Sequence, residues 1–189
     1  MELDLNLRVR VQLLEEKLNS SNLDGFVEAS PGVRSLMVEY EPDVLPLKTL
    51  LKAVEHAEKD LGNSRNLHLP SRVIHLPIAF DESSTKSAID KYTRSVRAKA
   101  PYLPSNIDFI ARNNGVHSDT TGYVKSIMLS ASYMVLGLGD VYLGAPCAVP
   151  VDPLHRLVVP KYNPARTFTP EGSVGIGGSY VSFHVAPDE

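Results

Sequence analysis

The chain changes character at Ser132, and this change constrains the fold more than any other feature of the sequence. Before Ser132, apolar residues follow strand and helix periods over long stretches. After it, helical periodicity disappears, β-branched runs are short, and seven of the twelve glycines and seven of the fourteen prolines of the chain occur. Short strands separated by turn residues are typical of a compact β-barrel or sandwich. We therefore predict an α+β protein with a β-rich C-terminal part.

The first eighty residues predict a ferredoxin-like module. Apolar residues alternate along Leu3–Val11, which indicates a strand with one buried face, and a helical pattern then runs to Asn19. Strands are predicted at 25–29, 34–40 and 71–80, with a helix between Pro46 and Gly62. The order β-α-β-β-α-β is that of the split βαβ motif.

Three helices are predicted next. One begins after the polar cluster 81–85, a second begins at a capping box formed by Ser105 and Asp108, and a third covers residues 121–131. We therefore divide the chain into a ferredoxin-like module, residues 1–80, and a helical segment with a β-barrel, residues 81–189.

Composition excludes several classes of function. Nineteen Lys and Arg residues against twenty-two Asp and Glu give a net charge of -3, so no nucleic-acid or anionic-membrane partner is expected. We find neither an apolar signal core at the N-terminus nor a run of about 18 apolar residues, so a cytoplasmic protein is expected. The histidines lack metal-ligand spacing, and no metal is predicted.

The first candidate site is the segment VLGLGDVYLG, residues 135–144. It places Asp140 and Tyr142 among glycines that include Gly137 and Gly139. Glycines allow a backbone to approach a ligand closely, and Asp140 could accept N–H hydrogen bonds or act as a base. The alternative is that Asp140 only caps a turn.

The second candidate site is the proline-rich segment 160–180. Its prolines would pre-organise Asn163 and Arg166, and its glycine run includes Gly177 and Gly178. Arg166 could clamp a carboxylate or polarise a carbonyl, and the Asn163 amide could pair with another amide. The alternative is an ordered loop whose arginine satisfies local carbonyls.

Four motifs carry a resemblance to a known family: HLPIAFD, PSNIDFIARNNGV, ASYMVLGLGDVYLGAP and DPLHRLVVPKYNPARTFTPEGSVGIGG. They resemble the carboxyltransferase region of urea carboxylase, the biotin-dependent half of urea amidolyase, in its allophanate hydrolase subunit 1-like part. The resemblance covers nearly the whole chain and implies a ferredoxin-like part followed by a cyclophilin-like β-barrel. After Tyr180 the sequence departs from the family pattern, so we expect a barrel that lacks its closing strands.

The resemblance also implies a reaction, the transfer of a carboxyl group from carboxybiotin to urea to give allophanate. The chain has no Met-Lys biotin-attachment motif and no glycine-rich ATP loop. The expected partners are therefore urea, a carrier domain that brings the biotin, a separate domain that uses ATP, and an allophanate hydrolase subunit 2-like lobe. We expect no turnover from this chain alone.

Within that reaction, the resemblance gives the candidate residues specific roles. Asp140 would hold and deprotonate the amino group of urea, and Arg166 would stabilise developing negative charge. The residues expected to orient urea or the ureido ring of biotin are Asn163 and Tyr142. Those expected to shape the walls are Gly137, Gly139, Gly177 and Gly178.

Two related families offer alternative functions. One is a non-catalytic interaction module like the sporulation kinase inhibitor KipI, and the other is a 5-oxoprolinase component that would act with a second chain and ATP. The GLGD and KYNPAR strings have the carboxylase form, and they favour the enzyme part.

Overall fold

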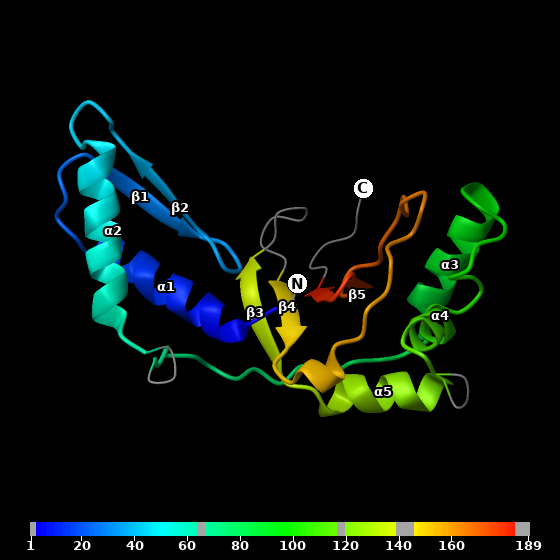
Figure 1. Ribbon diagram of the computed structural model, residues 1–189. Helices are drawn as coiled ribbons and strands as arrows, with labels where there is room; N and C mark the ends of the chain where they lie inside the picture. Colours follow the sequence, from blue (N-terminus) through cyan, green and yellow to red (C-terminus); the bar gives the residue numbers. More distant parts are fainter. Residues whose placement is uncertain (1–2, 64–66, 117–119, 139–145, 184–189) are drawn as a thin grey trace. The chain divides into compact units, whose positions relative to one another are not determined.

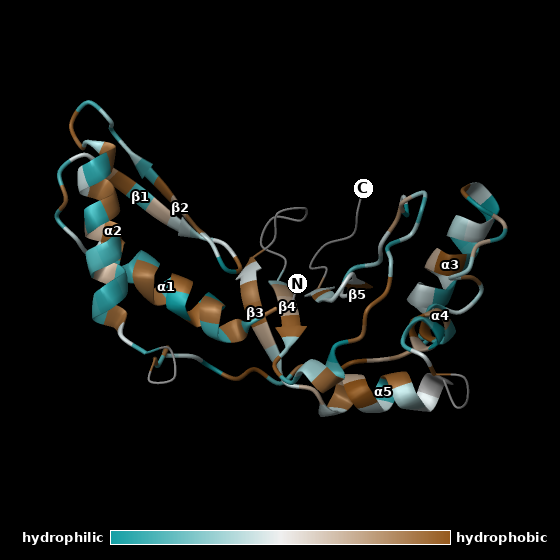
Figure 2. Ribbon diagram, in the orientation of Figure 1, coloured by the Kyte–Doolittle hydropathy of each residue, from teal (hydrophilic) through white to brown (hydrophobic). Residues whose placement is uncertain are grey.

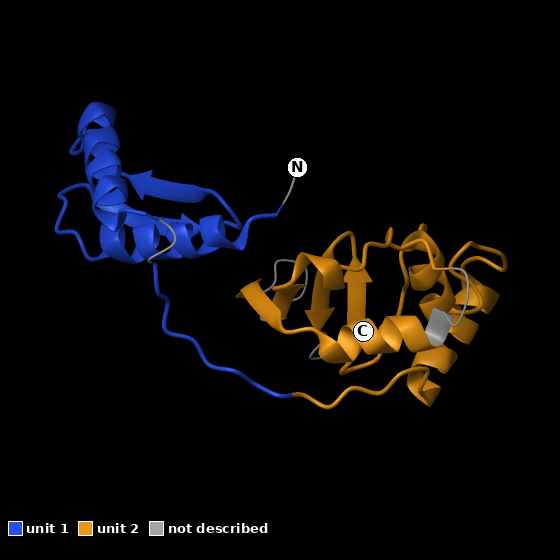
Figure 3. Cartoon of the chain, turned by 60° about the horizontal axis from the view of Figure 1, so that its bottom comes forward, with its two compact units in different colours: residues 1–75 blue, residues 76–189 orange. Residues whose placement is uncertain are grey.

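The computed structural model describes residues 3–63, 67–116, 120–138 and 146–183 (Figure 1). The chain forms two compact units, residues 1–75 and 76–189 (Figure 3). The described residues contain five α-helices and two antiparallel sheets, which confirms the predicted α+β class. None of the helices in these ranges combines the length and apolar character needed to cross a bilayer.

The first unit packs two helices against a hairpin. In chain order it contains α1 (Leu5–Asn19), β1 (Phe26–Pro31), β2 (Leu36–Tyr40) and α2 (Leu47–Leu61). The strands pair antiparallel, with Pro31 opposite Leu36 next to the turn. The buried core consists of Leu14, Leu18, Ala29 and Ala57. Figure 2 shows brown and teal residues alternating along α2, as expected for a helix with one apolar face.

The predicted strand at Leu3–Val11 is wrong, because most of this segment belongs to α1. The Asp4 side chain accepts a hydrogen bond from the Asn6 N–H at 2.9 Å and thereby caps the helix. Leucine and arginine dominate the segment, and both favour a helix more than a strand. The leucine alternation is therefore part of the same helix that the sequence predicts from Val11.

The predicted strand at 71–80 is also wrong, since no described residue of this segment pairs with a strand. Its apolar side chains are exposed, Val73 by 83% and Leu76 by 67%. In the predicted split βαβ motif this strand would lie beside the segment that instead forms α1, so the expected neighbour is missing. The first unit therefore has the order α-β-β-α in place of the ferredoxin-like order.

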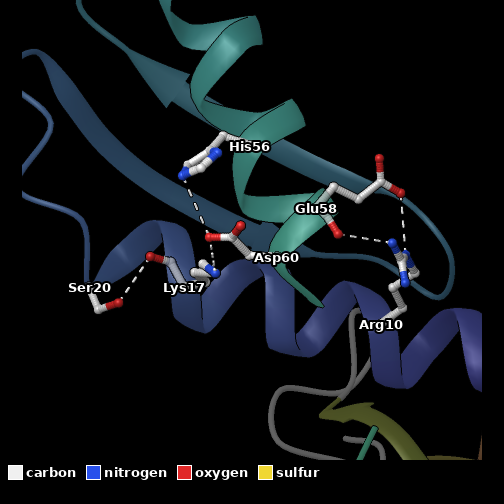
Figure 4. A network of polar contacts seen from close by, with 6 residues as sticks. All are labelled: Arg10, Lys17, Ser20, His56, Glu58 and Asp60. Carbon is white, nitrogen blue, oxygen red and sulfur yellow. Dashed lines mark hydrogen bonds and ion pairs between the residues drawn. The ribbon is translucent and has the colours of Figure 1, made fainter. Parts of the chain in front are cut away.

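Polar contacts join α1 to the C-terminal end of α2 (Figure 4). The Arg10 guanidinium donates to the carbonyls of Gly62 at 2.9 Å and Glu58 at 3.1 Å, and to the Glu58 carboxylate at 3.3 Å. Lys17 forms an ion pair of 2.8 Å with Asp60. The hydrogen bond from Lys17, with a smaller effect of His56, holds the pKa of Asp60 below its usual value. These contacts satisfy carbonyls that a helix end leaves without partners.

The second unit begins with the three predicted helices, α3 (Ser83–Ser95), α4 (Asn106–Asn113) and α5 (Thr120–Ser130). The Ser105 hydroxyl accepts from the Asp108 N–H at 3.2 Å, which confirms the predicted start of α4. At α3, the Glu82 carboxylate accepts from the N–H groups of Ser84 at 2.7 Å and Thr85 at 2.6 Å. Hydrogen bonds from Thr85 and Ser84 lower the pKa of Glu82 to about 2.

The sheet of the second unit is open. It contains β3 (Tyr133–Leu138), β4 (Pro146–Pro150), β5 (Val174–Gly177) and β6 (Tyr180–Phe183) in the order β3-β4-β6-β5. A 3-10 helix, η2 (Pro153–His155), follows β4. Among the described residues the two edge strands do not meet, so the expected cyclophilin-like β-barrel is here a four-stranded antiparallel sheet. The core is built from Ile107, Ala111, Val124 and Leu157.

Candidate functional site

The candidate site is the loop of residues 160–169, called here the site loop, and its base is fixed by backbone pairing. Val159 and Gly178 exchange two hydrogen bonds, of 3.1 and 2.9 Å. The Asn114 side chain, at the end of α4, bonds to both the N–H and the carbonyl of Val158 at 3.0 Å. The loop therefore leaves a rigid strand-like base beside the β5–β6 hairpin.

Two glycines of the hairpin make room for this base. Gly178 has a φ of 63°, a conformation that favours glycine, in the two-residue turn between Gly177 and Tyr180. The Lys161 side chain crosses Gly177, where a Cβ would come within 2.9 Å of Lys161 Cε. The predicted glycine run thus has two structural functions, a turn and a close approach.

An aromatic cluster supports the middle of the site loop. The rings of Tyr102 and Tyr162 stack with centroids 4.0 Å apart, and Tyr92 meets Tyr162 edge-on at 4.9 Å. The Tyr162 hydroxyl donates to the side chain of Asn106, the first residue of α4. Tyr92 and Tyr102 are 3% and 4% exposed, so the cluster is largely closed to water. Figure 1 shows the site loop, in orange, running beside α3.

Four hydrogen bonds tie the backbone of the loop to this cluster. Tyr92 donates to the carbonyl of Pro164 at 2.7 Å, and the Asn163 N–H donates to the Tyr102 hydroxyl at 3.2 Å. The Asn163 carbonyl has two donors within reach, Arg97 at 2.7 Å and Tyr102 at 2.9 Å. The Tyr92 and Tyr102 hydroxyls also lie 2.9 Å apart. The cluster therefore fixes the backbone at Asn163 and Pro164.

The cluster also shifts the pKa values of its phenols. Burial, with the hydrogen bond to Tyr102, raises the pKa of Tyr92 to about 12. Burial acts in the same direction on Tyr102, but hydrogen bonds from Tyr92, Asn163 and Arg97 to its anion outweigh it and lower its pKa. Burial raises the pKa of Tyr162. At neutral pH Tyr92 and Tyr162 are therefore neutral hydrogen-bonding groups.

The polar side chains of the loop remain available to a ligand. The Asn163 side chain is exposed and makes no hydrogen bond to any described residue. The Arg166 guanidinium lies 5.2 Å from the centroid of the Tyr162 ring, which limits where it can reach. Lys91, on α3, lies 4.5 Å from the centroid of the Phe168 ring. An amide on a braced loop, with cations on the loop and beside it, suits a planar carbonyl compound or a carboxylate.

The structure places the predicted site residues unevenly. It brings Asn163 and Arg166 onto one loop, with Gly177 and Gly178 at its base. Gly137 lies on β3 next to a register shift in the pairing with β4, and the space around its Cα is open. Asp140, Tyr142 and Gly139 lie outside the described residues.

Sequence reasoning did not find the residues that brace the loop. It placed Tyr92 on the core face of α3, which is correct, but gave no role to its hydroxyl. Tyr102 and Arg97 were not singled out. A buried tyrosine usually needs a partner for its hydroxyl, and three tyrosines near one polar loop were the available signal.

Comparisons with known proteins identify the class. Residues 1–187 match the family model described as carboxyltransferase domain, subdomain C and D. The chain therefore belongs to this carboxyltransferase family, which confirms the resemblance seen in its motifs.

The similar proteins are much longer. Urea amidolyase of Saccharomyces cerevisiae is 42% identical over 185 residues, which are 98% of this chain and 10% of that protein. The crystal structure of the K. lactis urea amidolyase matches 98% of this chain and 11% of its own with a TM-score of 0.80 and 42% identity. That of the Kluyveromyces lactis urea carboxylase covers 99% of this chain and 16% of its own, also at 0.80.

Proposed function

We propose that this chain forms part of the acceptor site of a urea carboxylase, at which a carboxyl group is transferred to urea to give allophanate. The observation that carries the proposal is the site loop, in which Asn163 and Arg166 are presented on a backbone fixed by buried tyrosines. The 42% identity to a urea amidolyase over 98% of the chain supports the same function. It also favours the carboxylase over the KipI-like and 5-oxoprolinase alternatives.

The chemistry requires a base and a cation. Urea is neutral and planar, and its nitrogen is a poor nucleophile because its lone pair is delocalised into the carbonyl. A new C–N bond forms between that nitrogen and the carboxyl carbon, while the bond from this carbon to the donor nitrogen breaks. The proton lost by urea ends on the donor nitrogen, so the atoms balance. A carboxylate that takes up the proton and a cation that stabilises the anionic oxygens would lower the barrier.

In this proposal the residues divide the work. Asp140 holds and deprotonates the amino group of urea, and Arg166 stabilises the negative charge on the oxygens. Asn163 and Tyr142 orient urea or the ureido ring of the donor. Asn163 suits this task, because its amide offers one acceptor and two donors, and none of them is used within the described residues.

The donor would be biotin, which supplies the carboxyl group and would be carried on a separate domain. The exposed amide of Asn163 and the guanidinium of Arg166 are groups that fit its ureido ring and its carboxylate. ATP would be used on a further domain, and an allophanate hydrolase subunit 2-like lobe would complete the site. Because the chain spans 10% of the yeast relative, we expect no urea-dependent turnover from this chain alone.

The proposal is tested by Asp140→Asn in the intact carboxylase that contains this chain. This change keeps the size of the side chain and removes the base, so urea-dependent turnover should fall by about 100-fold or more. ATP-dependent carboxylation of biotin, measured without urea, should remain unchanged. Asp152→Asn is the matched control, because Asp152 caps the 3-10 helix η2 through the Leu154 N–H. Normal urea turnover in Asp140→Asn would remove Asp140 from the mechanism.

A further inference from the structure

We propose that Tyr92, Tyr102 and Arg97 are positioning residues. They fix the backbone of Asn163 and Pro164, and this determines where Asn163 and Arg166 meet the substrate. The inference rests on the proposed function for its catalytic part. Its structural part can be tested separately in the 189-residue chain.

The protons of the cluster can be assigned by counting donors and acceptors. Two phenol protons are available for three contacts, which are the Pro164 carbonyl, the Asn163 carbonyl and the oxygen pair of the two tyrosines. If both protons went to carbonyls, the phenol oxygens would face each other at 2.9 Å with no proton between them. Arg97 resolves this conflict, because it donates to the Asn163 carbonyl at 2.7 Å.

The remaining bonds then form one directed chain. The Asn163 N–H donates to Tyr102, Tyr102 donates to Tyr92, and Tyr92 donates to the Pro164 carbonyl. Every donor and acceptor in the chain has a partner, which is the requirement for buried polar groups. The hydrogen bonds thus fix two successive peptide units of the loop from the side of α3.

This arrangement differs from ordinary core packing. Phenylalanine at positions 92 and 102 would fill nearly the same volume and bury no hydroxyl. Each hydroxyl is instead directed at the backbone of an exposed loop that lies more than sixty residues further along the chain. The ring of Tyr162 is held in the same cluster and faces the Arg166 guanidinium. A change in the cluster would therefore be transmitted to both Asn163 and Arg166.

The structural test measures amide hydrogen exchange at Asn163 by NMR in the 189-residue chain. Tyr102→Phe removes the acceptor of the Asn163 N–H, so this amide should exchange about two- to tenfold faster. Tyr92→Phe should give a smaller increase, because it acts through Tyr102. Tyr133→Phe is the matched control, since the Tyr133 hydroxyl bonds to the Met128 carbonyl at 3.4 Å and not to the loop. Unchanged exchange at Asn163 in both cluster variants would overturn the proposal.

The catalytic test uses the same variants in the intact carboxylase. Tyr102→Phe and Tyr92→Phe should lower kcat for urea-dependent turnover by about tenfold, as expected for groups displaced from their reacting partners. ATP-dependent carboxylation of biotin should not change, and Tyr133→Phe should retain normal kcat. Faster exchange at Asn163 with normal kcat would overturn the positioning role and leave the proposed function intact. Failure of the proposed function itself would appear in Asp140→Asn, and the exchange measurement would still test the brace.

Discussion

The side chain of Lys161 crosses the backbone of Gly177, and no β carbon fits between them without a shift. A Cβ on Gly177 would lie 2.9 Å from Lys161 Cε and 3.3 Å from Lys161 Cγ. The close contact is with a flexible side chain, so it is relieved when the lysine moves. This relationship connects the β5–β6 hairpin to the first residues of the site loop.

Gly177→Ala should therefore cost little stability in the absence of Lys161. We expect the loss in the free energy of unfolding caused by Gly177→Ala to be smaller in a Lys161→Ala background than in the natural chain. A double-mutant cycle by urea denaturation measures this coupling. Additive effects of the two changes would show that this contact does not form in solution.

Gly178→Ala should be destabilising for a different reason. No atom lies within 4 Å of the position of a new Cβ, but the φ of 63° is unfavourable for alanine. We expect the free energy of unfolding to fall by about 1–2 kcal/mol. Gly178→Asn should cost less than Gly178→Ala, because asparagine tolerates this conformation better. Equal stability of the alanine variant and the natural chain would contradict this backbone conformation.

Glu82 should make the stability of the second unit depend on acid pH. Its pKa is about 2 in the folded chain and near 4.5 without its hydrogen bonds, so the folded state binds the proton more weakly. The stability that the cap provides is fully present above pH 4.5 and is lost as the pH falls toward 2. Glu82→Gln should lower the thermal midpoint at pH 7 and flatten this acid-dependent loss. Glu82→Asp, which keeps a carboxylate at the cap, should preserve most of both effects.

Arg10 should stabilise the first unit more than Lys17 does. The Arg10 guanidinium reaches three acceptors at the end of α2, and its side chain is 22% exposed. Arg10→Ala should lower the free energy of unfolding by about 1–2 kcal/mol, since the carbonyls lose charged donors. Lys17→Ala should have a smaller effect, because the ion pair with Asp60 is exposed to solvent and salt. Chemical denaturation of both variants at low and high salt tests this order.

Val124 should be the most sensitive apolar position of α5. It is fully buried against Ile107, Ala111 and Leu157. Val124→Ala removes two methyl groups and leaves a cavity, so we expect a loss of about 2 kcal/mol in the free energy of unfolding. Val151→Ala, at a position 48% exposed, is the control and should change stability by less than about 0.5 kcal/mol. Similar losses in both variants would contradict the placement of α5 in the core.

The parts of the fold that were predictable from sequence are those specified by local signals. The helices of the second unit have caps such as Ser105, and the turn at Gly178 needs a glycine. The failures, at Leu3–Val11 and 71–80, involve segments whose apolar pattern suits a strand but whose conformation depends on distant partners. The same limit applies to the site. Asn163 and Arg166 could be selected from their residue types, whereas the hydrogen bond from Tyr92 to Pro164 joins positions that no local pattern connects.

The stretch from Pro70 to Pro77 consists of eight consecutive exposed residues, and each unit keeps its own buried core on either side of it. A protease would find there an extended backbone that needs no local unfolding before cleavage. Limited digestion should therefore cut the polypeptide into two fragments that retain their structure. The site loop, with its tyrosines, would remain entirely on the C-terminal fragment, which makes that fragment a practical starting point for ligand titration.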